Sequence, residues 1–130
     1  MIERRAVIAI VDDDVRVGES LGELLESAGY AVRTFGSAAA LLREDVSDID
    51  CLVTDIGMPE IDGFDLVERI KRQRPDTPVF MITARDDPGD LQRVIAHDIN
   101  GLFRKPFDVD QLLAAIGRHV RAGNGSTDGQ

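Results

Sequence analysis

The stretch Ala6-Val7-Ile8-Ala9-Ile10-Val11-Asp12-Asp13-Asp14 decides the fold class of this chain. Its first six residues are apolar and rich in β-branched side chains, with no polar residue between them. Such a run is typical of a strand buried on both faces, as in a parallel sheet. An amphipathic stretch over residues 15–28 follows the three acids, and Gly29 ends it. The chain therefore opens with a β-strand, an acidic turn and a helix.

The same alternation continues to residue 121. Further strands are predicted over residues 31–35, 51–55, 79–83 and 102–103. Further helices are predicted over residues 37–44, 64–74, 89–96 and 108–121. Five alternating β/α units with short connections predict a parallel sheet with helices on both faces. Residues 122–130 are rich in Gly and polar residues, and we expect a disordered tail or the start of a linker.

Size and charge narrow the classes of function. The 130 residues fit one domain, and 15 basic against 24 acidic residues give a formal net charge of −9. This charge disfavours direct binding to nucleic acid or to anionic lipid. The sequence has neither a membrane-length apolar segment nor a signal peptide. Since Cys51 is its single cysteine, we expect a cytoplasmic protein.

Chemically active side chains stand where the predicted strands end. Asp12 and Asp13 follow the first strand, Asp55 ends the third, Thr83 ends the fourth, and Lys105 follows the fifth. Ligands of such sheets bind at the carboxyl ends of the strands. Clustered carboxylates bind a hard cation such as Mg²⁺, while a hydroxyl and an ammonium can hold phosphoryl oxygens. The inventory suits phosphoryl transfer to an aspartate.

Each motif also has a purely structural interpretation. An acidic run after a strand is often only a helix N-terminus, and Asp14 is predicted to be the cap of the helix that follows. Asp62 and Gly63 are expected to form a turn that enters the next helix. The loop that begins at Asp55 is more specific, because Met58-Pro59 after a strand-end acid is not needed for a turn.

In these motifs, and in their order and spacing, residues 5–121 resemble the receiver domain of two-component response regulators. Within this family the chain most resembles the FixJ-type branch, which is FixJ- and NarL-like. The segments that carry this likeness are Val11 to Asp14, Ser27 to Tyr30 and Thr34 to Ser37. The resemblance implies a CheY-like, flavodoxin-like (βα)5 sandwich of three layers, with a five-stranded parallel sheet of order 2-1-3-4-5. Residues 1–121 would form the receiver domain.

The resemblance also implies roles at the acidic end of the site. Asp55 matches the phosphoacceptor of the family. Asp13 matches the residue that binds Mg²⁺ directly, and Asp12 matches its neighbour, which acts through water. Gly57 stands where the family supplies a backbone carbonyl to the metal.

Further roles are implied on the other side of the site. Thr83 matches the conserved switch hydroxyl of the family and Lys105 its conserved lysine, and Lys105-Pro106 matches the usual cis peptide bond. The switch position that usually carries Tyr or Phe is Leu102 here. Phe103 is expected on the opposite face of that strand.

Two further departures concern regulation. Asp98-Ile99 replaces the usual small pair before the last strand, which suggests an altered output and dimer surface. Gly57 and Arg85 occupy the positions that modulate hydrolysis in this family. Gly57 could admit water, and Arg85 could shield or hold the phosphate, so the direction of their effect stays open.

Three alternative functions are compatible with these residues. The first is a phosphorylation-controlled switch that takes a phosphoryl group from a sensor histidine kinase and loses it slowly through its own catalysis. A DNA-binding output domain, another effector or a homodimer would be its downstream partners. The second is an interaction module without productive phosphorylation, motivated by Leu102 and Asp98-Ile99. The third is a metal-dependent phosphatase.

Overall fold

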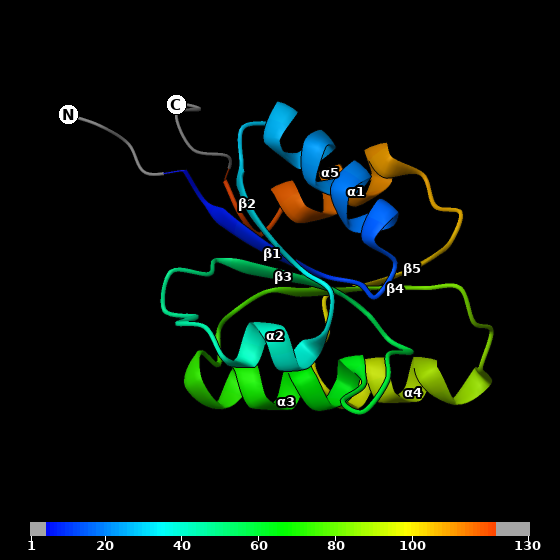
Figure 1. Cartoon of the computed structure of the whole chain (residues 1–130). Helices are drawn as coiled ribbons and strands as arrows, with labels where there is room; N and C mark the ends of the chain where they lie inside the picture. The colour runs from blue at the N-terminus through cyan, green and yellow to red at the C-terminus, as the bar shows by residue number, and fades with distance from the viewer. Residues whose placement is uncertain (1–4, 122–130) are drawn as a thin grey trace.

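A computed structural model describes residues 5–121, which form a five-stranded sheet flanked by helices (Figure 1). All strands pair in parallel, in the order β2-β1-β3-β4-β5. The predicted fold class and strand order are therefore confirmed. The strands are β1 (Val7–Val11), β2 (Ala31–Phe35), β3 (Cys51–Asp55), β4 (Val79–Thr83) and β5 (Gly101–Arg104).

Helices cover both faces of the sheet, as expected from βα units that alternate sides. Figure 1 shows a layer of helices on each face of the sheet. One layer consists of α1 (Val15–Ser27) and α5 (Val109–Gly117). The other layer consists of α2 (Ala38–Leu42), α3 (Gly63–Gln73) and α4 (Pro88–Ala96).

Two predicted helices were too long. The second helix ends at Leu42 instead of residue 44, with Arg43 as its C-cap. The last ends at Gly117 instead of residue 121, and Arg118 is its C-cap. In the last helix the reason is Gly117, because glycine is a poor helix former. The amphipathic pattern that follows Gly117 lies in a turn. The prediction for residues 122–130 lies outside the described residues.

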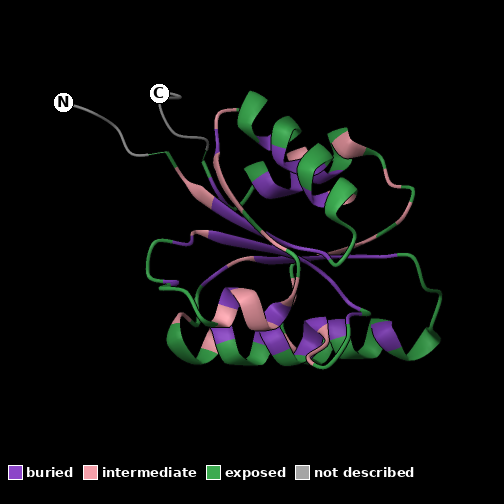
Figure 2. Cartoon of the chain, viewed as in Figure 1, coloured by how far each residue is buried: buried purple, intermediate pink, exposed green. Residues whose placement is uncertain are grey.

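Each face of the sheet has its own hydrophobic core, and Figure 2 shows the buried strands between them. The first core contains Ile10, Val53 and Phe80 beneath α1 and α5. The second contains Leu52 and Met81 beneath α2, α3 and α4. Strand residues alternate between the two cores, which explains why residues 51–53 of β3 and residues 79–82 of β4 are all apolar.

Leu102 and Phe103 of β5 follow the predicted alternation. Leu102 packs against the core beneath α2, α3 and α4, while Phe103 packs against the core beneath α1 and α5. The ring of Phe103 therefore cannot take the place of an aromatic side chain at position 102.

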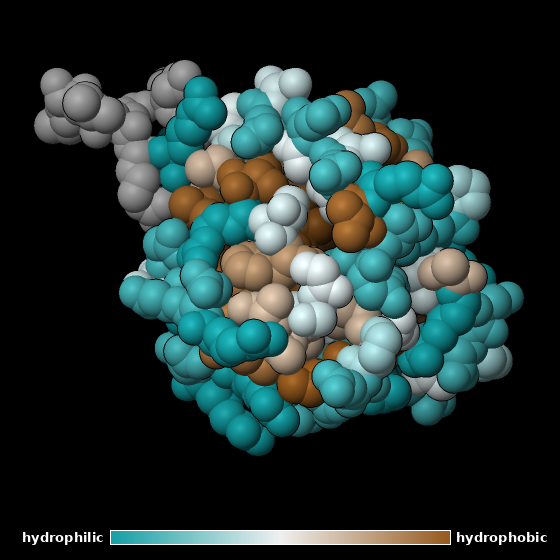
Figure 3. Space-filling view, viewed as in Figure 1, coloured by the Kyte–Doolittle hydropathy of each residue, from teal (hydrophilic) through white to brown (hydrophobic). Residues whose placement is uncertain are grey.

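Hydrophilic residues dominate the face seen in Figure 3, with smaller apolar areas between the two helical layers. Such a distribution is ordinary for a folded domain, because polar groups alone cannot cover its surface. Among residues 5–121, no helix has both the length and the apolar character needed to cross a bilayer.

Candidate functional site

The chemically active residues meet at the carboxyl edge of the sheet. β2 and β3 lie on opposite sides of β1, so the connections that leave β1 and β3 diverge. Such a divergence opens a crevice at the strand ends. Asp12 and Asp13 follow β1 and Asp55 ends β3, so the acids flank this crevice.

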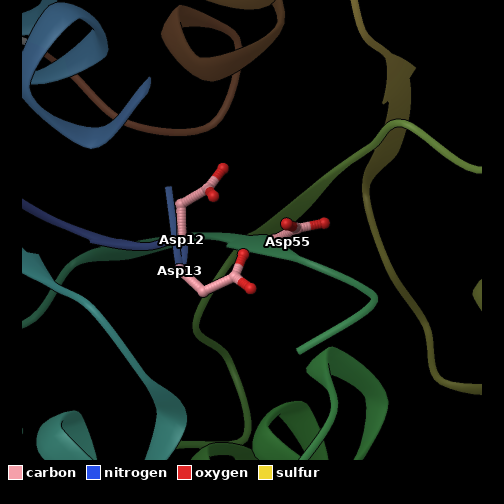
Figure 4. Close-up of side chains that lie close together, drawn as sticks. All are labelled: Asp12, Asp13 and Asp55. Carbon is pink, nitrogen blue, oxygen red and sulfur yellow. The ribbon is translucent and has the colours of Figure 1, made fainter. Parts of the chain in front are cut away.

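Three carboxylates converge there (Figure 4). Asp12, Asp13 and Asp55 each offer one oxygen, and these oxygens lie within 4.8 Å of one another. Asp12 is 2% and Asp55 7% exposed, whereas Asp13 faces solvent. The backbone N–H of Asp14 donates to Oδ1 of Asp12 at 2.8 Å, which fixes that carboxylate. Oxygen donors at this spacing suit a hard divalent cation such as Mg²⁺.

Lys105 supplies the positive charge of the site. Its Nζ donates to Oδ2 of Asp12 at 2.9 Å and lies 3.5 Å from Oδ2 of Asp55. Its backbone N–H donates to the carbonyl oxygen of Thr83 at 2.7 Å, and its peptide bond to Pro106 is cis. The ammonium therefore lies over two buried acids that would otherwise repel each other.

Burial and charge shift the protonation of this group. Burial, and next the charge of Asp12, raise the pKa of Asp55, against the opposing effect of Lys105. Burial lowers the pKa of Lys105, but the hydrogen bond to Asp12 and the charge of Asp55 outweigh it, so its pKa is raised overall. Lys105 therefore stays charged at neutral pH.

The raised pKa of Asp55 predicts a stability effect. A raised folded-state pKa favours folding below the ordinary Asp range, and this gain is lost as pH rises through the folded pKa. We therefore expect Asp55→Asn to raise the Tm of the metal-free protein at pH 7, because the substitution removes a buried charge that lies beside Asp12. Thermal unfolding in EDTA at pH 7 and pH 4 measures this, and the gain should shrink at the lower pH.

Asp76→Asn is the matched control, because Asp76 is an exposed acid in the loop that precedes β4, away from the carboxylate cluster. It should leave Tm nearly unchanged at both pH values. An Asp55→Asn variant less stable than the wild type at pH 7 would contradict the proposed repulsion.

Thr83 is buried at the end of β4, and its hydroxyl has a defined partner. The backbone N–H of Arg85 donates to its Oγ1 at 3.0 Å. The Arg85 side chain turns to Asp90 of α4, with both contacts at 2.8 Å. Asp90 was not singled out in the sequence, where it resembles an ordinary first-turn acid.

The loop after β3 is compact. Gly57 is exposed in it, two residues beyond Asp55, and a side chain there would meet nothing within 4 Å. Gly63 starts α3, and its N–H donates to the carbonyl of Ile56 at 2.9 Å. Asp62 caps the same helix by accepting from the N–H of Asp65. The expected turn and helix entry are thus present.

Leu102 and Asp98, where the sequence differs from the usual pattern of the family, both lie near α4 and β5. Leu102 is half-buried and lines a cavity of about 240 Å³ together with Thr83, Arg85 and Leu91. Asp98 follows α4 with φ of 55°, a left-handed conformation that Asp tolerates better than most residues. Lys71 of α3 donates to the Asp98 carbonyl at 2.7 Å.

The chain is similar to known proteins over nearly the whole part that the structure describes. A family model described as the response regulator receiver domain matches residues 8–117. The DNA-binding transcriptional regulator NtrC of Rhizobium meliloti is 38% identical over 87% of this chain. The transcriptional regulatory protein FixJ of Bradyrhizobium diazoefficiens is 33% identical over 88% of it.

The chain spans only part of those relatives, 24% of NtrC and 56% of FixJ. Among solved structures, the chemotaxis protein CheY4 of Vibrio cholerae is 28% identical with a TM-score of 0.81. That alignment covers 90% of this chain and all of the other.

Proposed function

The chain belongs to the response regulator receiver domain family, and on that premise we propose that it is a phosphorylation-controlled switch with Asp55 as acceptor. Family membership supports a role in phosphorylation-dependent signalling. The observation that carries the choice of Asp55 is its surroundings: a nearly buried carboxylate with an ammonium 3.5 Å away and two further acids beside it.

The proposed step is nucleophilic displacement at phosphorus. A carboxylate oxygen of Asp55 attacks the phosphorus of a phosphohistidine on a sensor histidine kinase, and a P–O bond forms. The P–N bond breaks, its electron pair stays on the imidazole nitrogen, and that nitrogen takes a proton from solvent. Hydrolysis later breaks the same P–O bond, with water as nucleophile, and returns the carboxylate and inorganic phosphate.

Asp12, Asp13 and Asp55, with the carbonyl of Gly57, would hold Mg²⁺. The donor set fits, since three carboxylate oxygens lie within 4.8 Å of one another. When bound, Mg²⁺ would reduce the repulsion between these acids and an incoming phosphoryl group. Asp12 orients Lys105 through their 2.9 Å contact, which keeps the ammonium beside the attacking oxygen.

Phosphorylation would change what the neighbouring groups contact. Phosphoryl oxygens on Asp55 would compete with Asp12 for Lys105 and would accept a hydrogen bond from Thr83. Thr83 lines the same cavity as Leu102, so its movement would alter the packing between α4 and β5. We propose this surface as the output region, with Leu102 in place of an aromatic reporter.

Family membership supports the proposed partners. We propose a sensor histidine kinase as donor and an effector or output domain as recipient of the signal, since FixJ and NtrC are regulators longer than this chain. Homodimerisation, a receiver domain over residues 1–121 and a cytoplasmic location stay predictions.

Incubation with phosphoramidate, a small donor with a P–N bond, tests the function. Intact mass should show one added phosphoryl group with Mg²⁺ and none in EDTA. A folded, Mg²⁺-binding protein that stays unlabelled would favour the interaction module instead. Sustained turnover of para-nitrophenyl phosphate would favour the phosphatase.

A further inference from the structure

Asp90 is a buried acid outside the carboxylate cluster. It lies in the first turn of α4 and is 3% exposed. Its two oxygens accept from Nε and Nη2 of Arg85, both at 2.8 Å. Such a two-pronged contact defines the geometry of both side chains, and one buried partner protects it from water and salt.

The Arg85–Asp90 ion pair is linked to the carboxyl edge of the sheet through Thr83. The backbone N–H of Arg85 donates to Oγ1 of Thr83 at 3.0 Å. A hydroxyl has one proton to donate, and an incoming hydrogen bond on its oxygen limits where that proton can point. The position of Arg85 therefore restricts the orientation of the Thr83 hydroxyl.

The far side of the pair is also fixed. α4 contacts α3 through the guanidinium of Arg93, which lies 4.1 Å from the ring centre of Phe64 and 3.6 Å from Oδ2 of Asp62. His97, the C-cap of α4, contacts Glu68 of α3 at 3.0 Å. Asp90 is therefore part of a helix that is held along its length.

We propose that the Arg85–Asp90 pair is a positioning element for Thr83, and that it keeps the Arg85 guanidinium away from the phosphoryl group. The proposal rests on the function proposed above. It argues against both roles left open for Arg85, shielding the phosphate or holding it, because the Arg85 side chain is already paired with Asp90. Arg85 thus acts through Thr83 rather than on the phosphate.

Arg104–Asp86 provides a matched comparison. It joins Arg104 of β5 to Asp86 of the loop before α4, at 2.7 Å, but both side chains are more than half exposed. Exposed pairs contribute little to stability or geometry. Removing the Arg104–Asp86 pair should therefore leave the orientation of the Thr83 hydroxyl unchanged.

The test compares wild type with Arg85→Gln, Asp90→Asn, the double variant and the control Asp86→Asn. The rate of labelling by acetyl phosphate with Mg²⁺ is followed by intact mass. Both single variants should slow it by about fivefold or more, because a displaced group loses its alignment. The double variant should be no slower than the slower single, and Arg85→Lys, which keeps one contact, should recover part of the rate.

Two readouts separate positioning from general damage. The amide resonance of residue 85 should shift in Asp90→Asn, while the affinity of the carboxylates for Mg²⁺, measured by titration, stays at the wild-type value. If Asp90→Asn does not fold, Arg85→Gln and Arg85→Lys carry the test, since the Arg85 side chain is 40% exposed.

Three results would overturn the proposal. These are wild-type labelling rates in the single variants, opposite effects of Arg85→Gln and Asp90→Asn, or independent effects that multiply in the double variant. Opposite effects would show that a guanidinium released from Asp90 acts on the phosphoryl group directly, and that the alignment of Thr83 does not limit the rate. If the wild-type protein is not phosphorylated at all, the proposed function fails. The positioning role is then tested by the amide resonance of residue 85 alone, and no shift of that resonance in Asp90→Asn would overturn it.

Discussion

Replacing Lys105 with alanine should slow phosphorylation of Asp55 by about a hundredfold or more, because a fixed donor aimed at developing negative charge is lost. In the structure its Nζ lies 2.9 Å from Asp12 and 3.5 Å from Asp55. Without the ammonium, two nearly buried carboxylates face each other and the incoming phosphoryl group. The rate of labelling by acetyl phosphate at saturating Mg²⁺ measures the effect.

Lys71→Ala is the control for the loss of a lysine. Lys71 bonds the carbonyl of Asp98 on the α3–α4 side and lies 3.8 Å from its carboxylate, so its contacts are with Asp98 and not with Asp12, Asp13 or Asp55. It should label at the wild-type rate. A Lys105→Ala variant that labels within a factor of about two of wild type would contradict the role given to the ammonium.

Gly63→Ala should lower both stability and phosphorylation. A methyl group on Gly63 would lie far inside contact distance of the Asp55 carbonyl oxygen and 3.0 Å from Cα of Ile56. Backbone atoms of Asp55 and Ile56 would have to move, because no flexible side chain can yield. We expect a cost of about 3 kcal/mol, or about 10 °C in Tm, with slower labelling of the displaced Asp55.

Gly36→Ala is its control. Gly36 also lies in a loop after a strand, but a methyl group there would meet nothing within 4 Å. Its Tm should stay within about 2 °C of wild type. A Gly63→Ala variant as stable as Gly36→Ala would mean that the approach of α3 to the end of β3 is looser than the structure indicates.

The fold could be predicted because its sequence signals are local and repeated. Residues 6–11 and 79–82 are apolar without interruption, which is typical of a strand covered on both faces. Their alternation with amphipathic stretches then limits the topology to a few arrangements. Helix ends were less predictable, as at Gly117, because apolar periodicity continues where the backbone has already left the helix.

The gathering of the site residues could also be expected, since parallel strands end at one edge. Asp12, Asp13, Asp55 and Lys105 do meet there. Asp90 could not be found from the sequence, because its importance depends on burial and on the direction of the Arg85 side chain. Both are properties of tertiary packing, and five residues of spacing between Arg and Asp do not reveal them.

The most direct test of the account is to locate the phosphoryl group. After labelling with acetyl phosphate and Mg²⁺, borohydride reduction converts an aspartyl phosphate to homoserine, and peptide mass analysis identifies the residue. We expect homoserine at position 55 alone, with none in EDTA or in Asp55→Asn. Homoserine at Asp12 or Asp13, or labelling that persists in Asp55→Asn, would contradict Asp55 as the acceptor.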